Sequence, residues 1–417
     1  MDDPSCDHGR RLWVARASSA SFSLPLGLDD RERFTLTIEF NNSPEPTLGV
    51  EEEYQLCDPY TGDLVPVADS IMEAAPEDLR GRLSYDLLRT LVEVNTVVCG
   101  TVDEAVADLL HRRRQVLAVA ESVGCTLGLT GTHPYADPKE QRFVSTPDYR
   151  WVAEQLGYVA QRNLTFGLHV HVGVDDGDRA VYIANRLRKW LGALIAIAAN
   201  SPFLDNVDTG WDSSRLYAFG AFPRAGIPPR LRTFKEFAKH IDGLIAVGSI
   251  TKARQIWWNV RAHPQYGTVE MRVYDVMASM PRTAAMIALT QALVVAYADE
   301  HRNGVPEPEL CEEYLEDLRW KGMRFGLEAK VIDPEVCEVC TMREFIGRLM
   351  EVARPAARGL GTEHYLGAVD GILEEGNGAT RQRAMLVDHG GDLKVLQHEL
   401  LREARDIGIE NPELPIE

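Results

Sequence analysis

The sequence predicts an α+β fold with a largely antiparallel sheet, helices on its apolar face and a helical C-terminal third. Several short segments alternate strictly between apolar and ionisable residues, as strands with one buried face do. Two of them are joined by a short turn and predict a β-hairpin. From Pro281 onward the apolar residues recur with helical spacing. No change in composition marks a domain boundary, so we expect one domain over residues 46–410 after a disordered extension over residues 1–45.

Composition excludes several classes of partner and location. The chain has 417 residues, of which 45% are hydrophobic and 26% charged, with a formal net charge of −19. Such a charge argues against binding to nucleic acid or to anionic membranes. There is no run of about eighteen apolar residues and no secretory signal. Seven scattered cysteines fit a reducing compartment, so we expect a cytoplasmic protein.

The first half of the chain predicts short strands that alternate with helices. Thr101 and Glu104 form the sequence pattern of a capping box at the start of the longest of these helices. We expect strands at 35–40, 48–56, 83–98, 125–130 and 165–174, and helices at 67–75, 101–122, 148–162 and 179–199.

The second half begins with a long irregular segment, residues 201–231. Its length and its interleaved aromatic and arginine residues favour a functional loop; they are Trp211, Arg215, Tyr217, Phe222 and Arg224. Strands at 256–262 and 268–275 form the predicted hairpin. Helices are expected at 281–302, 309–326, 341–356, 362–375, 379–388 and 392–407.

Four strands share one habit: each places ionisable groups on one face and aliphatic groups on the other. The polar faces carry Glu51 and Glu53, then Glu93, then His169 and His171, and finally Thr268, Glu270, Arg272 and Tyr274. By the same alternation Glu52 faces the apolar side, so we interpret it as structural. One such face is usually just solvated. Four of them, restricted largely to Glu, His and Arg, predict a site.

Clustered carboxylates repel one another unless a cation lies between them. The glutamates therefore suggest bound Mg²⁺ or Mn²⁺, which prefer oxygen ligands. The pair His169 and His171 is also compatible with zinc. Arg272 is placed to meet a phosphate oxygen beside a metal ion. Neither of the common glycine-rich nucleotide-binding loops is present.

Taken together, these motifs resemble the carboxylate–amine ligase family, often labelled glutamate–cysteine ligase type 2. The resemblance covers about residues 46–400 and depends on the order and number of the motifs. They are TLGVEEEY at 47–54, LVEVNT at 91–96, GTHP at 131–134, GLHVHVG at 167–173, ANSP at 199–202, DTG at 208–210, SR at 214–215 and TVEMRV at 268–273.

The resemblance implies an ATP-dependent ligase with a curved, mainly antiparallel sheet, a funnel similar to that of glutamine synthetase and guanidino kinases. ATP and Mg²⁺ are expected on its concave face. A substrate carboxylate would be phosphorylated to an acyl phosphate, and an amine would then displace phosphate to give an amide. Weak glutamate–cysteine ligation is the expected activity, and the resemblance is compatible with a homo-oligomer.

The resemblance also assigns roles to residues. The expected metal ligands are Glu51, Glu53, Glu93, Glu270 and His169. ATP contacts are expected from His169, His171 and Arg272, with His171 equally compatible with a supporting role behind the ligands. Asp86 matches a position near the attacking amine, and Arg215 and Arg272 are expected to bind phosphate or the substrate carboxylate. His133 is interpreted as a turn residue, Arg381 and Arg383 gain little from the match, and the Cys337–Cys340 spacing is interpreted as incidental.

Two other functions remain open from the residues. One is a zinc-dependent amidohydrolase that uses His169, His171 and a glutamate. The other is a non-catalytic nucleotide-binding homologue. In each case the partner is a small molecule rather than nucleic acid or a membrane.

Overall fold

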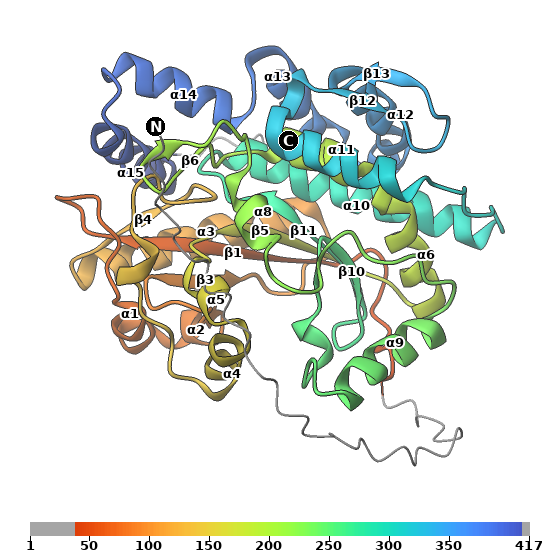
Figure 1. Ribbon diagram of the computed structural model, residues 1–417, viewed down its shortest axis with the longest axis horizontal. Helices are drawn as coiled ribbons and strands as arrows, with labels where there is room; N and C mark the ends of the chain where they lie inside the picture. The colour runs from red at the N-terminus through yellow and green to blue at the C-terminus, as the bar shows by residue number, and fades with distance from the viewer. Residues whose placement is uncertain (1–37, 411–417) are drawn as a thin grey trace, which may run out of the picture. The chain divides into compact units, whose positions relative to one another are not determined.

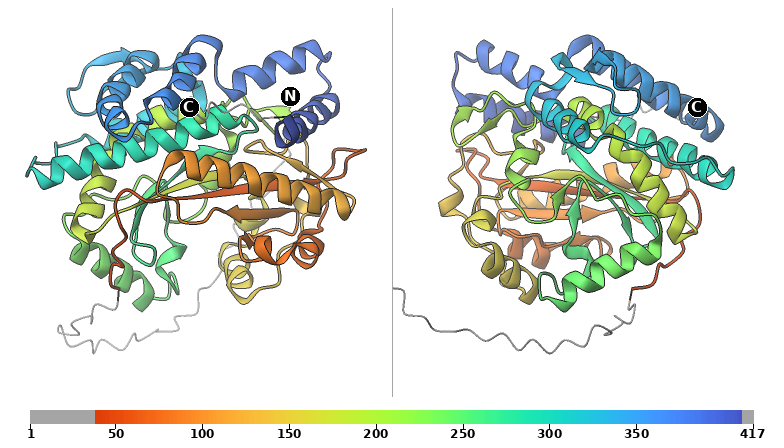
Figure 2. Two further views of the ribbon diagram at one scale, coloured as in Figure 1. Left: turned by 180° about the vertical axis from the view of Figure 1, so that it is seen from behind. Right: turned by 45° about the vertical axis from the view of Figure 1, so that its right-hand side comes forward.

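The computed structural model describes residues 38–410. Figures 1 and 2 show a central sheet with helices stacked along it. Within the described residues no helix is both long enough and apolar enough to cross a membrane. Residues 1–37 lie outside the described part, and so does most of the predicted N-terminal extension.

The central sheet has seven strands in the order β10-β11-β5-β1-β3-β2, and β4 also pairs with β1. Every pairing in this sheet is antiparallel, which confirms the predicted antiparallel sheet of an α+β fold. The strands are β1 (Leu48–Cys57), β2 (Leu83–Ser84), β3 (Leu91–Asn95), β4 (Thr126–Gly128), β5 (Gly167–Gly173), β10 (Val260–His263) and β11 (Thr268–Asp275).

One face of the sheet packs against a helical layer. The long helices α3 (Val102–Ser122) and α10 (Met280–Arg302) contact β1 and β5, while α6 (Gly177–Leu187) and α7 (Leu191–Ala198) contact the β11 side (Figures 1 and 2). The alternating aliphatic residues of the strands point into this layer, where Val50, Leu168 and Val170 are at most 1% exposed. Burying such side chains is worth about 1.5–3 kcal/mol each. The opposite face is therefore left to the ionisable residues.

The alternation of side chains that was predicted for residues 268–275 is interrupted in β11. A bulge interrupts its pairing with β5 between Met271 and Tyr274. The prediction that Tyr274 shares the polar face of Glu270 is therefore wrong: Tyr274 is fully buried and its hydroxyl contacts Thr290 of α10. Asp275 takes the polar side instead, opposite Gly167. Bulges commonly redirect side chains in this way.

The C-terminal third is helical except for one hairpin that the sequence did not predict. β12 (Lys330–Ile332) pairs with β13 (Val339–Thr341), and Cys337 and Cys340 lie in this hairpin as free thiols. The helices are α11 (Glu312–Phe325), α12 (Met342–Leu360), α13 (Gly367–Glu375), α14 (Gly378–Asp388) and α15 (Leu393–Glu410).

Other expected elements need correction. The helix expected over 179–199 is divided between α6 and α7 by a 3₁₀ turn, and the one over 148–162 breaks at Gly157, whose φ is +51°. The segment 201–231 contains short elements, and α9 (Phe234–Ala246) was not predicted. The short elements not yet named are α1 (Ala68–Ala74), α2 (Glu77–Arg80), α4 (Pro147–Leu156), α5 (Tyr158–Gln161), β6 (Phe203–Leu204), β7 (Val207–Asp208), α8 (Ser214–Phe219), β8 (Ala225–Gly226) and β9 (Trp257–Trp258).

Residues 38–45 contain no helix or strand, so the strand expected over 35–40 is absent from its described part. Two backbone hydrogen bonds hold this segment to the sheet. The amide of Asn41 donates to the carbonyl of Pro264 at 2.9 Å, and that of Ser43 donates to the carbonyl of Val174 at 3.1 Å. The boundary between an extension and a domain at residue 46 stays a prediction.

Candidate active site

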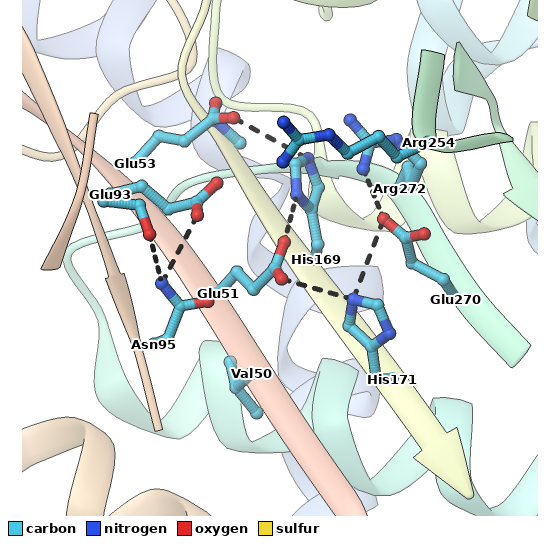
Figure 3. Close-up of polar contacts among 12 residues, drawn as sticks. Val50, Glu51, Glu53, Glu93, Asn95, His169, His171, Arg254, Glu270 and Arg272 are labelled. Carbon is cyan, nitrogen blue, oxygen red and sulfur yellow. Dashed lines mark hydrogen bonds and ion pairs between the residues drawn. The ribbon is translucent and has the colours of Figure 1, made fainter. Parts of the chain in front are cut away.

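The antiparallel register makes the predicted site residues direct cross-strand neighbours. Glu51 of β1 pairs with His169 of β5, and Glu53 of β1 pairs with Glu93 of β3. On the other side of β5, His171 pairs with Glu270 of β11. Opposed residues on one face lie about 5 Å apart at Cβ. Figure 3 shows these side chains converging on one face, while Val50 points to the other.

The two histidines differ in what their ring nitrogens meet. His169 is neutral because burial and the nearby Arg272 lower its pKa to about 3. Its Nε2 therefore accepts from Arg215 Nη2 at 3.3 Å, and its Nδ1 donates to Glu51 Oε2 at 3.2 Å. Both nitrogens are occupied by protein groups.

One ring nitrogen of His171 has no hydrogen-bond partner among the described residues. Its Nδ1 lies 2.9 Å from the Thr268 hydroxyl. Its buried Nε2 makes no hydrogen bond to the described residues, although it lies 3.4 Å from Glu51 Oε1 and 3.7 Å from Glu270 Oε1. Burial lowers the pKa of His171, but Glu270 and Glu51 raise it above its ordinary value.

Negative charge is concentrated at the β1–β3 side of the site. Burial and Asp86 raise the pKa of Glu53 to about 7. Burial, Glu51 and Glu53 raise the pKa of Glu93 well above its usual range. For Glu51, burial raises the pKa, but His171 and His169 hold it well below normal. These carboxylates repel one another in the absence of a cation.

Within residues 38–410, two groups of three ligands place their donor atoms within 4.8 Å of one another. One consists of Glu51, His171 and Glu270, and the other of Glu51, Glu93 and His169. Neither group contains both histidines. Among the described residues, donor atoms of both histidines and a glutamate therefore do not lie within 4.8 Å of one another, as the zinc hydrolase alternative would require.

Arginines balance the charge on the β11 side. Arg272 and Arg261 each bond one oxygen of Glu270, and together they hold its pKa well below the usual range against the effect of burial. Arg215 approaches from α8 and also donates to the Arg272 carbonyl at 3.3 Å. The buried Nε atoms of Arg215 and Arg272 have no hydrogen-bond partner in the described structure. Such donors suit an anionic ligand.

Asp86 lies in the segment between β2 and β3, within electrostatic range of the predicted site. Burial raises its pKa, and Arg272, Tyr149 and Arg215 counteract that effect. The predicted residues on the strands therefore share one face of the sheet, and Asp86 and Arg215 interact with them from outside the strands.

The structure adds three residues to those predicted for the site. Arg261 of β10 faces Glu270 across the hairpin. In the predicted hairpin, pairing His263 with Thr268 places Arg261 opposite Glu270, so the sequence could have identified this residue. Asn95, two residues after Glu93, donates to Glu93 Oε1 at 3.3 Å. Asp275 depends on the bulge, and the sequence gives no signal for it.

Several residues outside the predicted site have protein partners of their own. Glu52 is fully buried on the helix side and is paired with Arg113 of α3. Burial lowers the pKa of His133 to about 4, and the ring contacts the Gly62 carbonyl at 2.9 Å. Arg383 pairs with Asp208 and Asp212, and Arg381 with Glu403.

Two pockets adjoin these elements. One of about 390 Å³ opens beside Glu51 and His171 and is also lined by Arg82 and Tyr266. Another of about 590 Å³ is lined by aromatic side chains that include Trp211 and Tyr217 from the long segment 201–231. Both volumes fall in the range of small-molecule sites.

Comparison with known proteins decides the family. The sequence profile of the family "Glutamate-cysteine ligase family 2" matches residues 47–403 of this chain. The chain belongs to this family. It is 37% identical over 374 residues to a Thermobifida fusca protein named "Putative glutamate--cysteine ligase 2", covering 89% of this chain and 94% of that protein. A Rubrobacter xylanophilus protein named "Putative glutamate--cysteine ligase 2-3" is 38% identical over 364 residues, covering 86% and 97%. The resemblance inferred from the motifs is thus confirmed, and the family is one of ATP-dependent carboxylate–amine ligases.

Solved structures support the fold of the family. The glutamate–cysteine ligase of Francisella tularensis in complex with AMP superposes with a TM-score of 0.66 at 12% identity, covering 89% of both chains. A bifunctional glutathione synthetase from Pasteurella multocida gives a TM-score of 0.63 at 12% identity, covering 88% of this chain and 53% of that one. At such identity the likeness shows the fold alone.

Proposed function

We propose that the protein joins an amino-acid carboxylate to an amine at the expense of ATP, through an acyl phosphate, with weak glutamate–cysteine ligation. The observation that carries this proposal is the pairing of a surplus of carboxylates with arginines on one buried sheet face. Glu51, Glu53, Asp86, Glu93 and Glu270 interact here with Arg215, Arg261 and Arg272. Such a face suits a divalent cation and a polyphosphate together.

The residues fit Mg²⁺ or Mn²⁺. Their donors are mostly carboxylate oxygens, the ligands that these hard cations prefer. The unpartnered Nε2 of His171, together with Glu51 and Glu270, would hold one metal ion, and Glu93 and Glu53 would add carboxylate oxygens on the other side of Glu51. Because both nitrogens of His169 already have partners, we assign the metal contact to His171 and give His169 the role of orienting Glu51 and Arg215. When bound, the metal ions neutralise charge on the transferred phosphoryl group.

The arginines supply the remaining positive charge of the site. Arg272 and Arg215 each have a buried Nε without a hydrogen-bond partner in the described structure, and we place the phosphates beside these two guanidinium groups. In that position they stabilise negative charge on the γ-phosphoryl group and then on the acyl phosphate. Arg261 keeps Glu270 ionised and oriented, because it bonds the oxygen of Glu270 that Arg272 does not.

We assign Asp86 to the orientation and deprotonation of the attacking amine. Its raised pKa makes it a better proton acceptor than an ordinary aspartate, and it lies close enough to Arg215 and Arg272 to interact with both. It orients the attacking amine and takes its proton as the amide bond forms. The pocket of about 390 Å³ beside Glu51 and His171 receives one of the small-molecule substrates.

A screen of purified protein tests the proposal. Candidate amino acids are supplied in pairs with ATP and Mg²⁺, and ADP and phosphate are measured with and without each acid and amine. Amide formation with stoichiometric ADP and phosphate is expected for at least one pair. If no pair gives acid-dependent ADP and ATP shows no Mg²⁺-dependent binding, the proposal is wrong. Binding without turnover would favour the non-catalytic homologue. Cytoplasmic location and homo-oligomer formation stay predictions.

A further inference from the structure

Asp275 is a buried carboxylate that the proposed mechanism does not use. The bulge in β11 brings it to the polar face, where it pairs across strands with Gly167 of β5. It is 1% exposed. Burying a carboxylate this deeply costs folding free energy unless the carboxylate is fully hydrogen-bonded.

Three donors from two separate chain segments satisfy Asp275. The Asn200 amide and the Ser201 hydroxyl donate to Oδ2 at 2.7 and 2.6 Å, and the Ser213 hydroxyl donates to Oδ1 at 3.0 Å. Asp275 therefore joins the segment after α7 to the start of α8. No metal or substrate needs to be invoked to explain these contacts.

The joined segments place Arg215. Its amide donates to the Ser201 hydroxyl at 3.1 Å, the same hydroxyl that donates to Asp275. Its guanidinium lies over Gly167, so close that a Cβ at this glycine would overlap it. Since Gly167 is the cross-strand partner of Asp275, the guanidinium and the carboxylate are neighbours. Burial lowers the Arg215 pKa, and Glu53 and then Asp275 oppose that drop.

A second glycine makes room for the carboxylate itself. A Cβ at Gly131 would lie 2.6 Å from Asp275 Cγ, closer than real contacts allow. The Gly131 amide donates to the Asn200 carbonyl at 3.1 Å, which ties the same loop from the other side. Two glycines on adjoining segments thus create the space in which Asp275 and Arg215 lie side by side.

We propose that Asp275 is a positioning residue that fixes the Arg215 guanidinium against His169, and that it does so through its charge and through Ser201 and Ser213. The proposal rests on the function proposed above, in which Arg215 binds the phosphoryl group or the substrate carboxylate. A displaced guanidinium lowers turnover even though Asp275 touches no substrate, because small misplacements of such groups cost about 100-fold.

Asp275→Asn separates charge from shape. The amide keeps an oxygen for the Asn200 amide and Ser201, and its NH₂ group can donate to the Ser213 oxygen, so the loss is mainly that of the negative charge. A tenfold to 100-fold lower kcat/KM is expected. In an Arg215→Ala background, Asp275→Asn is expected to change kcat/KM less than threefold, because the residue it acts through is gone. Asp333→Asn is the matched control: Asp333 is equally buried but is held by Lys189 and Arg348 near the β12–β13 hairpin.

An equal loss of kcat/KM in both backgrounds, or none in either, overturns the proposal. Hydrogen exchange gives a readout that is independent of activity. Asp275→Asn is expected to raise exchange at the Asn200 and Arg215 amides about tenfold, whereas Asp333→Asn leaves it unchanged; unchanged exchange in Asp275→Asn counts against the proposal. If the wild-type protein has no ATP-dependent turnover, the function proposal fails, and exchange alone decides whether Asp275 positions the loop.

Discussion

Glu53→Gln should stabilise the metal-free protein at pH 8 while weakening its response to Mn²⁺. Burial and Asp86 raise the pKa of Glu53 from 4.5 to about 7. The folded state therefore binds this proton more tightly than the unfolded chain does, and stability is lost as pH rises from 4.5 through 7. At about 1.4 kcal/mol per pH unit, the ionised side chain costs about 3 kcal/mol above pH 7. Glutamine carries no charge and avoids this cost, while its oxygen can still accept from the Gly167 amide.

The assay is thermal unfolding of wild type and Glu53→Gln in EDTA at pH 5 and pH 8. Little difference is expected at pH 5. At pH 8 the variant should melt roughly 3–6 °C higher, since 1 kcal/mol moves Tm by about 2 °C in a chain of this size. Added Mn²⁺ should then raise the Tm of the wild type more than that of the variant, because binding to the folded state stabilises it by mass action.

Glu375→Gln is the charge-matched control. Its side chain is 76% exposed, and a substitution at such a surface position should change stability by less than about 0.5 kcal/mol. A Glu53→Gln variant that is less stable than wild type at pH 8 in EDTA would refute the reasoning. So would a gain of the same size at both pH values, because that gain would not come from ionisation.

Three further predictions concern neighbouring positions. His171→Gln should weaken Mn²⁺ binding, measured by calorimetry, at least tenfold more than His169→Gln does; the reverse order would return the metal contact to His169. Gly167→Ala should lower kcat/KM at least 100-fold with a folded circular dichroism spectrum, because its Cβ overlaps the guanidinium above it, and an active variant would contradict that packing. Arg113→Met should cost about 3–5 kcal/mol in urea unfolding by leaving Glu52 charged and buried, and a cost below 1 kcal/mol would mean that water reaches the pair.

Strand faces were the most predictable part of the site. Side chains alternate across a strand, so the sequence alone decides that Glu51 and Glu53 share a side and that Val50 and Glu52 share the other. The structure then brings the polar sides of four strands together by register, which places Glu51 beside His169 and Glu270 beside His171. The residues follow from local pattern, whereas their pairing follows from strand order, which the pattern does not contain.

Features that depend on irregularity were not predicted. The bulge after Met271 moves Tyr274 to the core and Asp275 to the site, and nothing in the TVEMRVYD segment marks it. The β12–β13 hairpin lies between the helices expected over 309–326 and 341–356, and it was not predicted because its strands have three residues each, too few to show a period of two. α9 was missed although Thr233 caps it by accepting from the Glu236 amide, a capping signal readable in the sequence.

β1 carries three consecutive glutamates, so both faces of this strand carry a carboxylate that needs a partner. Glu51 and Glu53 face the site, so Glu52 must enter the helical layer, where an unpaired charge would cost several kcal/mol. Arg113 pairs with it there and also donates to the carbonyls of Ala278 and Met277, at 2.8 and 2.9 Å. Those carbonyls belong to the connection from β11 to α10, only a few residues after the strand that carries Glu270. The buried pair therefore fixes the position of β1 relative to β11, the two strands on either side of β5 that supply carboxylates to the histidine face.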